Sequence, residues 1–193
     1  MTAKKATPQA TCTPVGGRMP GDPTREALIE RIIRVDQAGE YGAVRIYAGQ
    51  LAVLGNGAKG DMIRHMKEQE DVHLETFSKM ASDRRVRPTA LMPLWHVAGF
   101  MLGAGTALLG EKAAMACTVA VEETIDEHYQ EQIKKLGDDE KELRETCAKF
   151  REEELEHRDI GYAHGAENAA GYPILSRAIK FGTKLAINLS EKI

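Results

Sequence analysis

The sequence predicts an all-α protein, namely a four-helix bundle with an extra apolar helical segment and a C-terminal amphipathic helix. Three observations support this fold class. Apolar residues recur at offsets of three, four and seven over long stretches, which is the spacing of one helical face. Clusters of glycine and proline separate these stretches. No stretch alternates apolar and polar residues in the way that a half-buried strand does.

Four long helices are expected to form the bundle. Their expected ranges are 22–54, 61–85, 111–136 and 140–168. Asp22 followed by Pro23 is typical of a helix start, because an N-cap side chain accepts a backbone N–H and proline fits the first turn. Glycine or proline follows each range closely and predicts where each helix stops.

Length and composition predict a single domain. A chain of 193 residues suits one domain, which we expect over 22–193. Residues 1–21 have no acidic residue and are rich in Thr, Ala, Pro and Gly, so we expect a flexible tail without the apolar core of a secretory signal.

The net charge of −3 excludes a global basic field, so we expect no nucleic-acid partner. Three cysteines provide no disulfide framework.

Each expected bundle helix carries ionisable residues inside its apolar stripe. These residues are Glu40, then Glu70 with His73, then Glu122, then Glu154 with His157. The lone Glu precedes the Glu-x-x-His motif by thirty residues in the first half and thirty-two in the second, which indicates a duplicated helix hairpin. One Glu from each of two helices and Glu-x-x-His from each of the others form the di-iron or di-manganese site of ferritin-like bundles. The sequence therefore predicts a ferritin-like metal site.

Buried carboxylates of this kind need compensating positive charge. Four unpaired carboxylates would repel one another and take up protons, whereas two divalent cations balance four negative charges. Mixed oxygen and nitrogen ligands favour iron or manganese over tetrahedral zinc. The alternative is a helical lipid-binding or scaffold module whose inward carboxylates are hydrogen-bonded rather than metallated.

Several ionisable neighbours lie off the ligand stripe. Glu123, Glu153 and Glu156 are expected to be solvated, and Glu153→Ala is expected to be mild. His164 is one heptad after His157, and we expect a neighbouring or core histidine rather than a ligand. Asp36 precedes Glu40 by one helical turn and is a candidate hydrogen-bond partner for a ligand histidine.

Two further segments suit contact with a membrane. Residues 88–110 carry no charge and are long enough to span a bilayer, but a crossing there would separate the two halves of the ligand set. We therefore expect this segment to lie in the interface or to line a hydrophobic channel. Residues 174–193 form an amphipathic helix suited to anionic lipid. Its apolar side is marked by Ile174, Ala178, Phe181, Leu185 and Leu189, and its cations are Arg177, Lys180 and Lys184. The alternative is that both segments pack on the bundle or on a partner protein.

The chain resembles the demethoxyubiquinone hydroxylases of coenzyme Q biosynthesis over nearly everything after residue 24. The resemblance is strongest in 32–54, 85–95, 103–129 and 150–161. It implies a di-iron monooxygenase, peripherally bound to membrane, that uses O₂ to hydroxylate the ring of a polyprenylated methoxy-methyl-benzoquinol. Gln37 stands where many members have His, which leaves the ligands intact.

The resemblance also implies residue roles. The expected iron ligands are Glu40, Glu70, His73, Glu122, Glu154 and His157. Glu122 and Glu154 are the catalytic carboxylates expected to bridge the ions or change coordination. Trp95 and Tyr129 are candidates for binding the quinol ring, the alternatives being an interfacial anchor and a core residue.

Partners and location follow from the same resemblance. No GxGxxG fingerprint that follows an expected strand is present, so we expect an external reductant such as NADH to bind without a Rossmann domain or to act through another protein. Expected partners are the polyprenylated quinol, membrane lipid, other ubiquinone-biosynthesis proteins and a second copy of the chain, since Gly99-x-x-x-Gly103 permits close helix contact. We expect the cytoplasmic face of a bacterial inner membrane, with the mitochondrial matrix face as the alternative. A ferritin-like quinol oxidase or ferroxidase without ring hydroxylation is the alternative activity.

Overall fold

A computed structural model of the chain describes residues 21–193, and the predicted tail therefore lies almost entirely outside the described residues. Two short 3₁₀ turns and six α-helices account for the regular structure. The helices are α1 (Arg25–Leu54), α2 (Gly57–Asp83), α3 (Met92–Leu108), α4 (Glu111–Lys135), α5 (Lys141–Ala163) and α6 (Tyr172–Ser190). No strand occurs within 21–193, so the all-α prediction is confirmed.

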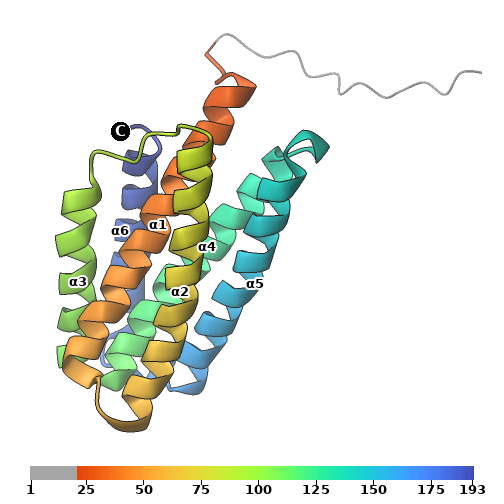
Figure 1. Ribbon diagram of the computed structural model, residues 1–193. Coiled ribbons are helices and arrows are strands. Elements are labelled where there is room, and N and C mark those ends of the chain that lie inside the picture. The colour runs from red at the N-terminus through yellow and green to blue at the C-terminus, as the bar shows by residue number, and fades with distance from the viewer. Residues whose placement is uncertain (1–20) are drawn as a thin grey trace, which may run out of the picture.

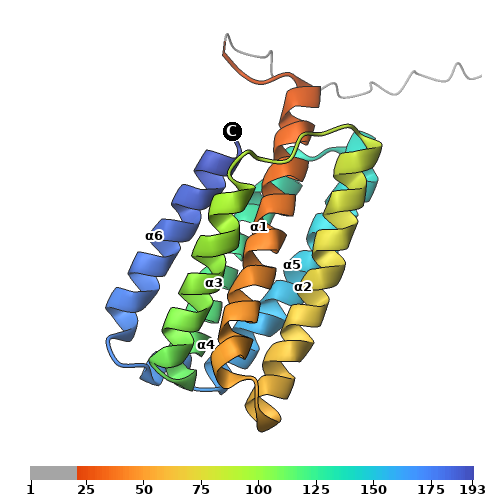
Figure 2. The same cartoon turned by 60° about the vertical axis from the view of Figure 1, so that its left-hand side comes forward.

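The long helices run side by side as a bundle (Figure 1). α1 pairs with α2 and α4 pairs with α5, as a duplicated hairpin requires. α3 packs along α1, and α6 packs along α4, so these two added helices flank one side of the bundle (Figure 2). None of the helices in the described chain is long and apolar enough to cross a membrane.

Helix ends differ from the expected ones by a few residues. The first helix begins at Arg25 because the Thr24 hydroxyl, rather than Asp22, accepts the Ala27 N–H at 3.1 Å. The second begins at Gly57 rather than at residue 61. The fourth bundle helix ends at Ala163, where Gly165 takes a φ of +79° before a 3₁₀ turn. None of these shifts moves a predicted ligand.

The glycines of α3 set how closely it packs on α1. A Cβ at Gly103 would lie 1.9 Å from the Ile46 carbonyl oxygen, and a Cβ at Gly49 would lie 2.2 Å from that of Phe100. The two helix backbones therefore touch through small residues. The Gly99-x-x-x-Gly103 motif serves this contact within the chain, and it gives no support to a homodimer.

Candidate metal centre

The structure brings all six expected ligands into one buried cluster inside the bundle. The six residues come from α1, α2, α4 and α5 and are at most 4% exposed. Potential ligand atoms lie within 4.8 Å of one another in two groups, which are Glu40, Glu70, His73 and Glu154, and Glu70, Glu122, Glu154 and His157. Glu70 and Glu154 belong to both groups, whereas Glu122 belongs to one. The geometry thus favours Glu70, rather than Glu122, as the second shared carboxylate beside Glu154.

Both histidines turn the same ring nitrogen towards the carboxylates. His73 Nδ1 lies 3.2 Å from Glu154 Oε1 and 3.4 Å from Glu40 Oε2. His157 Nδ1 lies 3.2 Å from Glu154 Oε2 and 3.2 Å from Glu70 Oε1. Because offsets of three residues share one helical face, each Glu-x-x-His motif presents its pair of side chains together. Glu154 therefore lies between the two imidazoles.

The outward nitrogens of the two histidines have hydrogen-bond partners that were not predicted from the sequence. His73 Nε2 donates to Glu153 Oε2 at 2.6 Å, and His157 Nε2 donates to Gln69 Oε1 at 3.0 Å. The expectation that Glu153 is solvated is wrong, because it lies at the edge of the buried stripe and reaches across to α2. Gln69 was not singled out at all, although it too directly precedes a Glu-x-x-His motif.

Two tyrosines form hydrogen bonds with Glu122 and Glu40, the carboxylates that each belong to only one of the two ligand groups. The Tyr47 hydroxyl donates to Glu122 Oε1 at 3.0 Å, and the Tyr129 hydroxyl donates to Glu40 Oε1. Burial and nearby carboxylates raise the pKa of both tyrosines, so both stay neutral donors. Tyr129 is 1% exposed in the core beside the cluster, and it does not line the apolar groove between α3 and α6. This position does not favour the predicted role of Tyr129 in binding the quinol ring.

The electrostatics of the cluster show that it needs positive charge. Burial, followed by repulsion from Glu154, raises the pKa of Glu70 and of Glu122. Burial also raises the pKa of Glu154, but hydrogen bonds with His157 and His73 lower it overall to about 2. Neither oxygen of Glu70 accepts a hydrogen bond from the described chain, although both are fully buried. A buried carboxylate without hydrogen bonds fits a cation ligand.

Asp36 does not serve a ligand histidine as predicted. Within the described chain it accepts a hydrogen bond from Gln132 Nε2 at 2.6 Å and lies 3.9 Å from Cys147 Sγ. His128 Nε2 is 3.8 Å away, and burial lowers the pKa of His128 to about 4, so its ring is neutral. Burial raises the pKa of Asp36 well above its usual value, against the opposing effect of Gln132.

Asp36→Asn is expected to stabilise the fold increasingly as the pH rises above about 4. The unfolded wild-type chain loses the Asp36 proton near that pH, whereas the folded chain keeps it to a higher pH. Wild-type stability therefore falls by up to about 1.4 kcal/mol per pH unit across this window, and asparagine does not titrate. Urea unfolding of both proteins from pH 5 to 8, in the same metal state, measures the difference. A difference that stays constant with pH would contradict the assignment.

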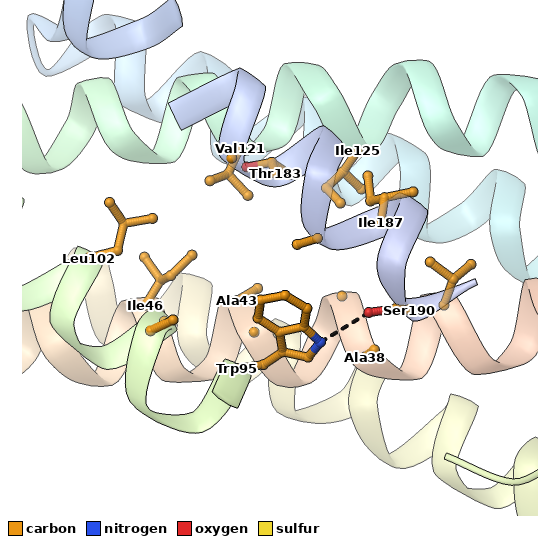
Figure 3. Close-up of a pocket in the computed structure, with 17 residues that line it drawn as sticks. Ala38, Ala43, Ile46, Trp95, Leu102, Val121, Ile125, Thr183, Ile187 and Ser190 are labelled. Carbon is orange, nitrogen blue, oxygen red and sulfur yellow. Dashed lines mark hydrogen bonds between the residues drawn. The ribbon is translucent and has the colours of Figure 1, made fainter. Parts of the chain in front are cut away.

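An apolar groove lies on the other side of α1 and α4 from the cluster. It encloses about 380 Å³ between α3 and α6, and Trp95, Leu102, Val121 and Ile187 are among its lining residues (Figure 3). Trp95 Nε1 donates to Ser190 Oγ at 3.0 Å across one end. The floor of the groove includes the residues that directly precede Glu40 on α1 and Glu122 on α4. Only α1 and α4 therefore separate the groove from the cluster. The predicted role of Trp95 in a ring pocket is compatible with this position.

α3 and α6, which form two walls of the groove, also carry exposed apolar side chains. On α3 and just after it they are Leu94, Val97, Met101, Leu108 and Leu109, and on α6 they are Ile174, Phe181 and Leu185. Two of the cations predicted to face lipid on α6 instead form ion pairs with α4. Lys180 pairs with Glu123 at 2.5 Å, and Lys184 pairs with Glu127 at 2.8 Å. These two lysines attach α6 to α4, so the apolar face carries more of any lipid contact than the charges do.

Comparison with known proteins identifies the family of the chain. A family model described as Ubiquinone biosynthesis protein COQ7 matches residues 27–190. A 3-demethoxyubiquinol 3-hydroxylase of Rhodospirillum rubrum is 66% identical over 177 residues, which cover 91% of this chain and 84% of the relative. A mitochondrial NADPH-dependent 3-demethoxyubiquinone 3-hydroxylase of Homo sapiens is 54% identical over 176 residues, covering 89% and 81%. A mitochondrial 5-demethoxyubiquinone hydroxylase of Saccharomyces cerevisiae is 40% identical over 184 residues, covering 86% and 79%. The chain, with its buried carboxylate and histidine cluster beside an apolar groove, belongs to the ubiquinone biosynthesis protein COQ7 family.

Proposed function

We propose that this protein is a di-iron monooxygenase that hydroxylates the ring of a polyprenylated demethoxyubiquinol in ubiquinone biosynthesis. The observation that carries the proposal is the buried set of four carboxylates and two imidazoles, arranged as two groups that share Glu70 and Glu154. Four negative charges balance two divalent cations, and shared carboxylates suit ions about 3.5–4 Å apart. The names of the relatives support the reaction, and the donor set supports the metal.

Two iron ions, when bound, supply the redox chemistry that activates O₂. The reaction inserts one oxygen atom into the ring, releases the other as water and consumes two electrons and two protons from an external reductant. A nicotinamide nucleotide fits this role, and the human relative is named NADPH-dependent. The chain's own residues would hold the metal with carboxylate oxygens and the two Nδ1 atoms, while Tyr47 and Tyr129 orient Glu122 and Glu40. Their burial also excludes water from the site.

The groove is proposed to take the quinol from lipid. Its lining is almost entirely apolar, and α3 and α6, which form two of its walls, carry exposed Leu, Val, Met, Ile and Phe side chains. Exposed apolar patches are typical of membrane or partner contact. We propose peripheral attachment through this face, at the cytoplasmic side of a bacterial inner membrane or the matrix side of the mitochondrial one. Related enzymes occur in a bacterium and in mitochondria.

The direct test is turnover of demethoxyubiquinol in vesicles. The iron-loaded protein, a reductant and ¹⁸O₂ are expected to give a product that mass spectrometry shows to contain one ¹⁸O atom in a new hydroxyl group. Oxygen uptake that yields only the oxidised, unhydroxylated quinone would instead favour a quinol oxidase. Accumulation of ferric mineral without quinol turnover would favour a ferroxidase.

Blocking the groove is expected to slow turnover without loss of iron. Ala186 lines the groove on α6, so Ala186→Trp fills the space that the quinol needs, and we expect kcat/KM to fall by about a hundredfold. The matched control is Ala178→Trp, which adds the same bulk at an exposed position of the same helix. Equal loss of activity in both variants would show that the groove does not take the substrate.

Phe181→Ser is expected to weaken vesicle binding by roughly ten- to a hundredfold. Phe181 is 72% exposed on α6, and burying such a side chain in lipid contributes about 1.5–3 kcal/mol. Co-sedimentation with phosphatidylcholine and phosphatidylglycerol vesicles measures the partition coefficient. Val72→Ser is the control, because Val72 is 52% exposed on α2, outside the α3 and α6 face. A decrease common to both variants would remove the case for this face.

A further inference from the structure

The residue before each inward Glu of the two Glu-x-x-His motifs contacts the histidine of the opposite motif. Glu153 on α5 lies 2.6 Å from His73 Nε2 on α2, and Gln69 on α2 lies 3.0 Å from His157 Nε2 on α5. Both histidines are completely buried. The two halves of the duplicated hairpin therefore hold each other's imidazoles by the same route.

These two contacts fix which nitrogen faces the cluster. A carboxylate or amide oxygen accepts, so Nε2 of each ring must carry its proton and donate it. When a metal ion is bound, each ring would be neutral and would direct an unprotonated Nδ1 at the ion beside the shared carboxylates, as a metal ligand must. Phe150 stacks on the His73 ring with centroids 3.9 Å apart and further restricts its rotation.

The two contacts differ in charge. The partner of His73 is an anionic carboxylate, whereas the partner of His157 is a neutral amide. A charge-assisted hydrogen bond is shorter and stronger than a neutral one, and it makes the imidazole a better electron donor to a metal ion. Lys149 Nζ lies 3.5 Å from Glu153 Oε1, but this pair is exposed on its lysine side and offsets little of the charge.

We infer that Glu153 and Gln69 are positioning residues that make the two metal positions unequal. The position formed by His73, Glu40 and the shared carboxylates binds a divalent cation more tightly and fills first. The position formed by His157 and Glu122 fills second. This inference rests on the proposed metal centre. The six ligands are of the same kinds at both positions, so the expected difference in metal affinity comes from the outer hydrogen bonds.

Stepwise binding of Mn²⁺ to the full-length apoprotein tests the inference. Free Mn²⁺ measured by electron paramagnetic resonance is expected to show two binding steps separated by roughly tenfold or more in affinity. Glu153→Gln is expected to weaken the tighter step about tenfold and bring the steps together. Gln69→Glu is expected to strengthen the weaker step by a similar factor, a gain that misfolding cannot produce. The double exchange Gln69→Glu with Glu153→Gln is expected to restore two separate steps.

The outcomes separate this inference from the proposed centre itself. Glu156→Gln is the control, because Glu156 is exposed on α5 and the titration should not change. Two ions bound with equal affinity in the wild type, or exchanges that leave the steps unchanged, would overturn the inference while leaving the metal centre intact. Failure of the wild type to bind two ions would overturn the centre.

Discussion

Glu154→Ala is expected to abolish both iron binding and hydroxylation. Glu154 belongs to both ligand groups, and its two oxygens each lie 3.2 Å from the Nδ1 of a different histidine. Its loss removes one ligand from each metal position and one of the four negative charges that balance two divalent cations. Elemental analysis after anaerobic iron loading is expected to fall from about two irons per chain to well below one. Product formation should fall by at least about a thousandfold, because the bound metal is the proposed source of the redox chemistry that activates O₂.

Variants of the neighbouring glutamates show whether this loss is specific. Glu156→Ala is the matched control, because the side chain is exposed on the same helix, and its iron content and turnover should match the wild type. Glu153→Ala should lie between the two, with iron affinity lowered about tenfold through its contact with His73 rather than abolished. Equal iron loss in Glu154→Ala and Glu156→Ala would mean that another face of α5 points into the bundle.

The sequence was sufficient to predict which six residues meet in the buried cluster but not the contacts around them. Offsets of three and four residues place Glu70 with His73 and Glu154 with His157 on single helical faces, and that rule needs no knowledge of neighbouring helices. The contact of Glu153 with His73 depends on how α5 is rotated against α2, which periodicity does not determine. The same holds for the hydrogen bond between Tyr47 and Glu122 on a different helix.

The two added helices illustrate a related limit. The absence of charge in residues 88–110 correctly indicated an apolar helix outside the four-helix bundle. Its position on α1, however, follows from the close approach of Gly103 to a backbone carbonyl, which requires the partner surface to be known. The lysines of α6 suggested a cationic side that faces lipid. In the structure they pair instead with Glu123 and Glu127 of α4, and the sequence does not show that these helices lie opposite each other.

Gly103→Ala is expected to destabilise the fold by about 3 kcal/mol. The added Cβ would lie 1.9 Å from the Ile46 carbonyl oxygen of α1, which is backbone and cannot rotate away. The two helices must therefore separate, and overpacking of this kind typically costs 1–3 kcal/mol or more. Urea unfolding of the metal-loaded protein measures the change. Because α3 forms one wall of the groove, we also expect a higher KM for the quinol.

Gly105→Ala on the same helix provides the opposite expectation. A Cβ there meets no described atom beyond its own stretch of helix within 4 Å, so alanine should stabilise α3 by up to about 1 kcal/mol through its higher helix propensity. A similar response to both substitutions would show that helix propensity, rather than the contact with α1, determines the effect. In Gly103→Ala the iron content should remain near that of the wild type, because α3 supplies none of the six cluster residues. Loss of quinol affinity with retained iron would then separate the groove from the metal centre as two functional parts of one bundle.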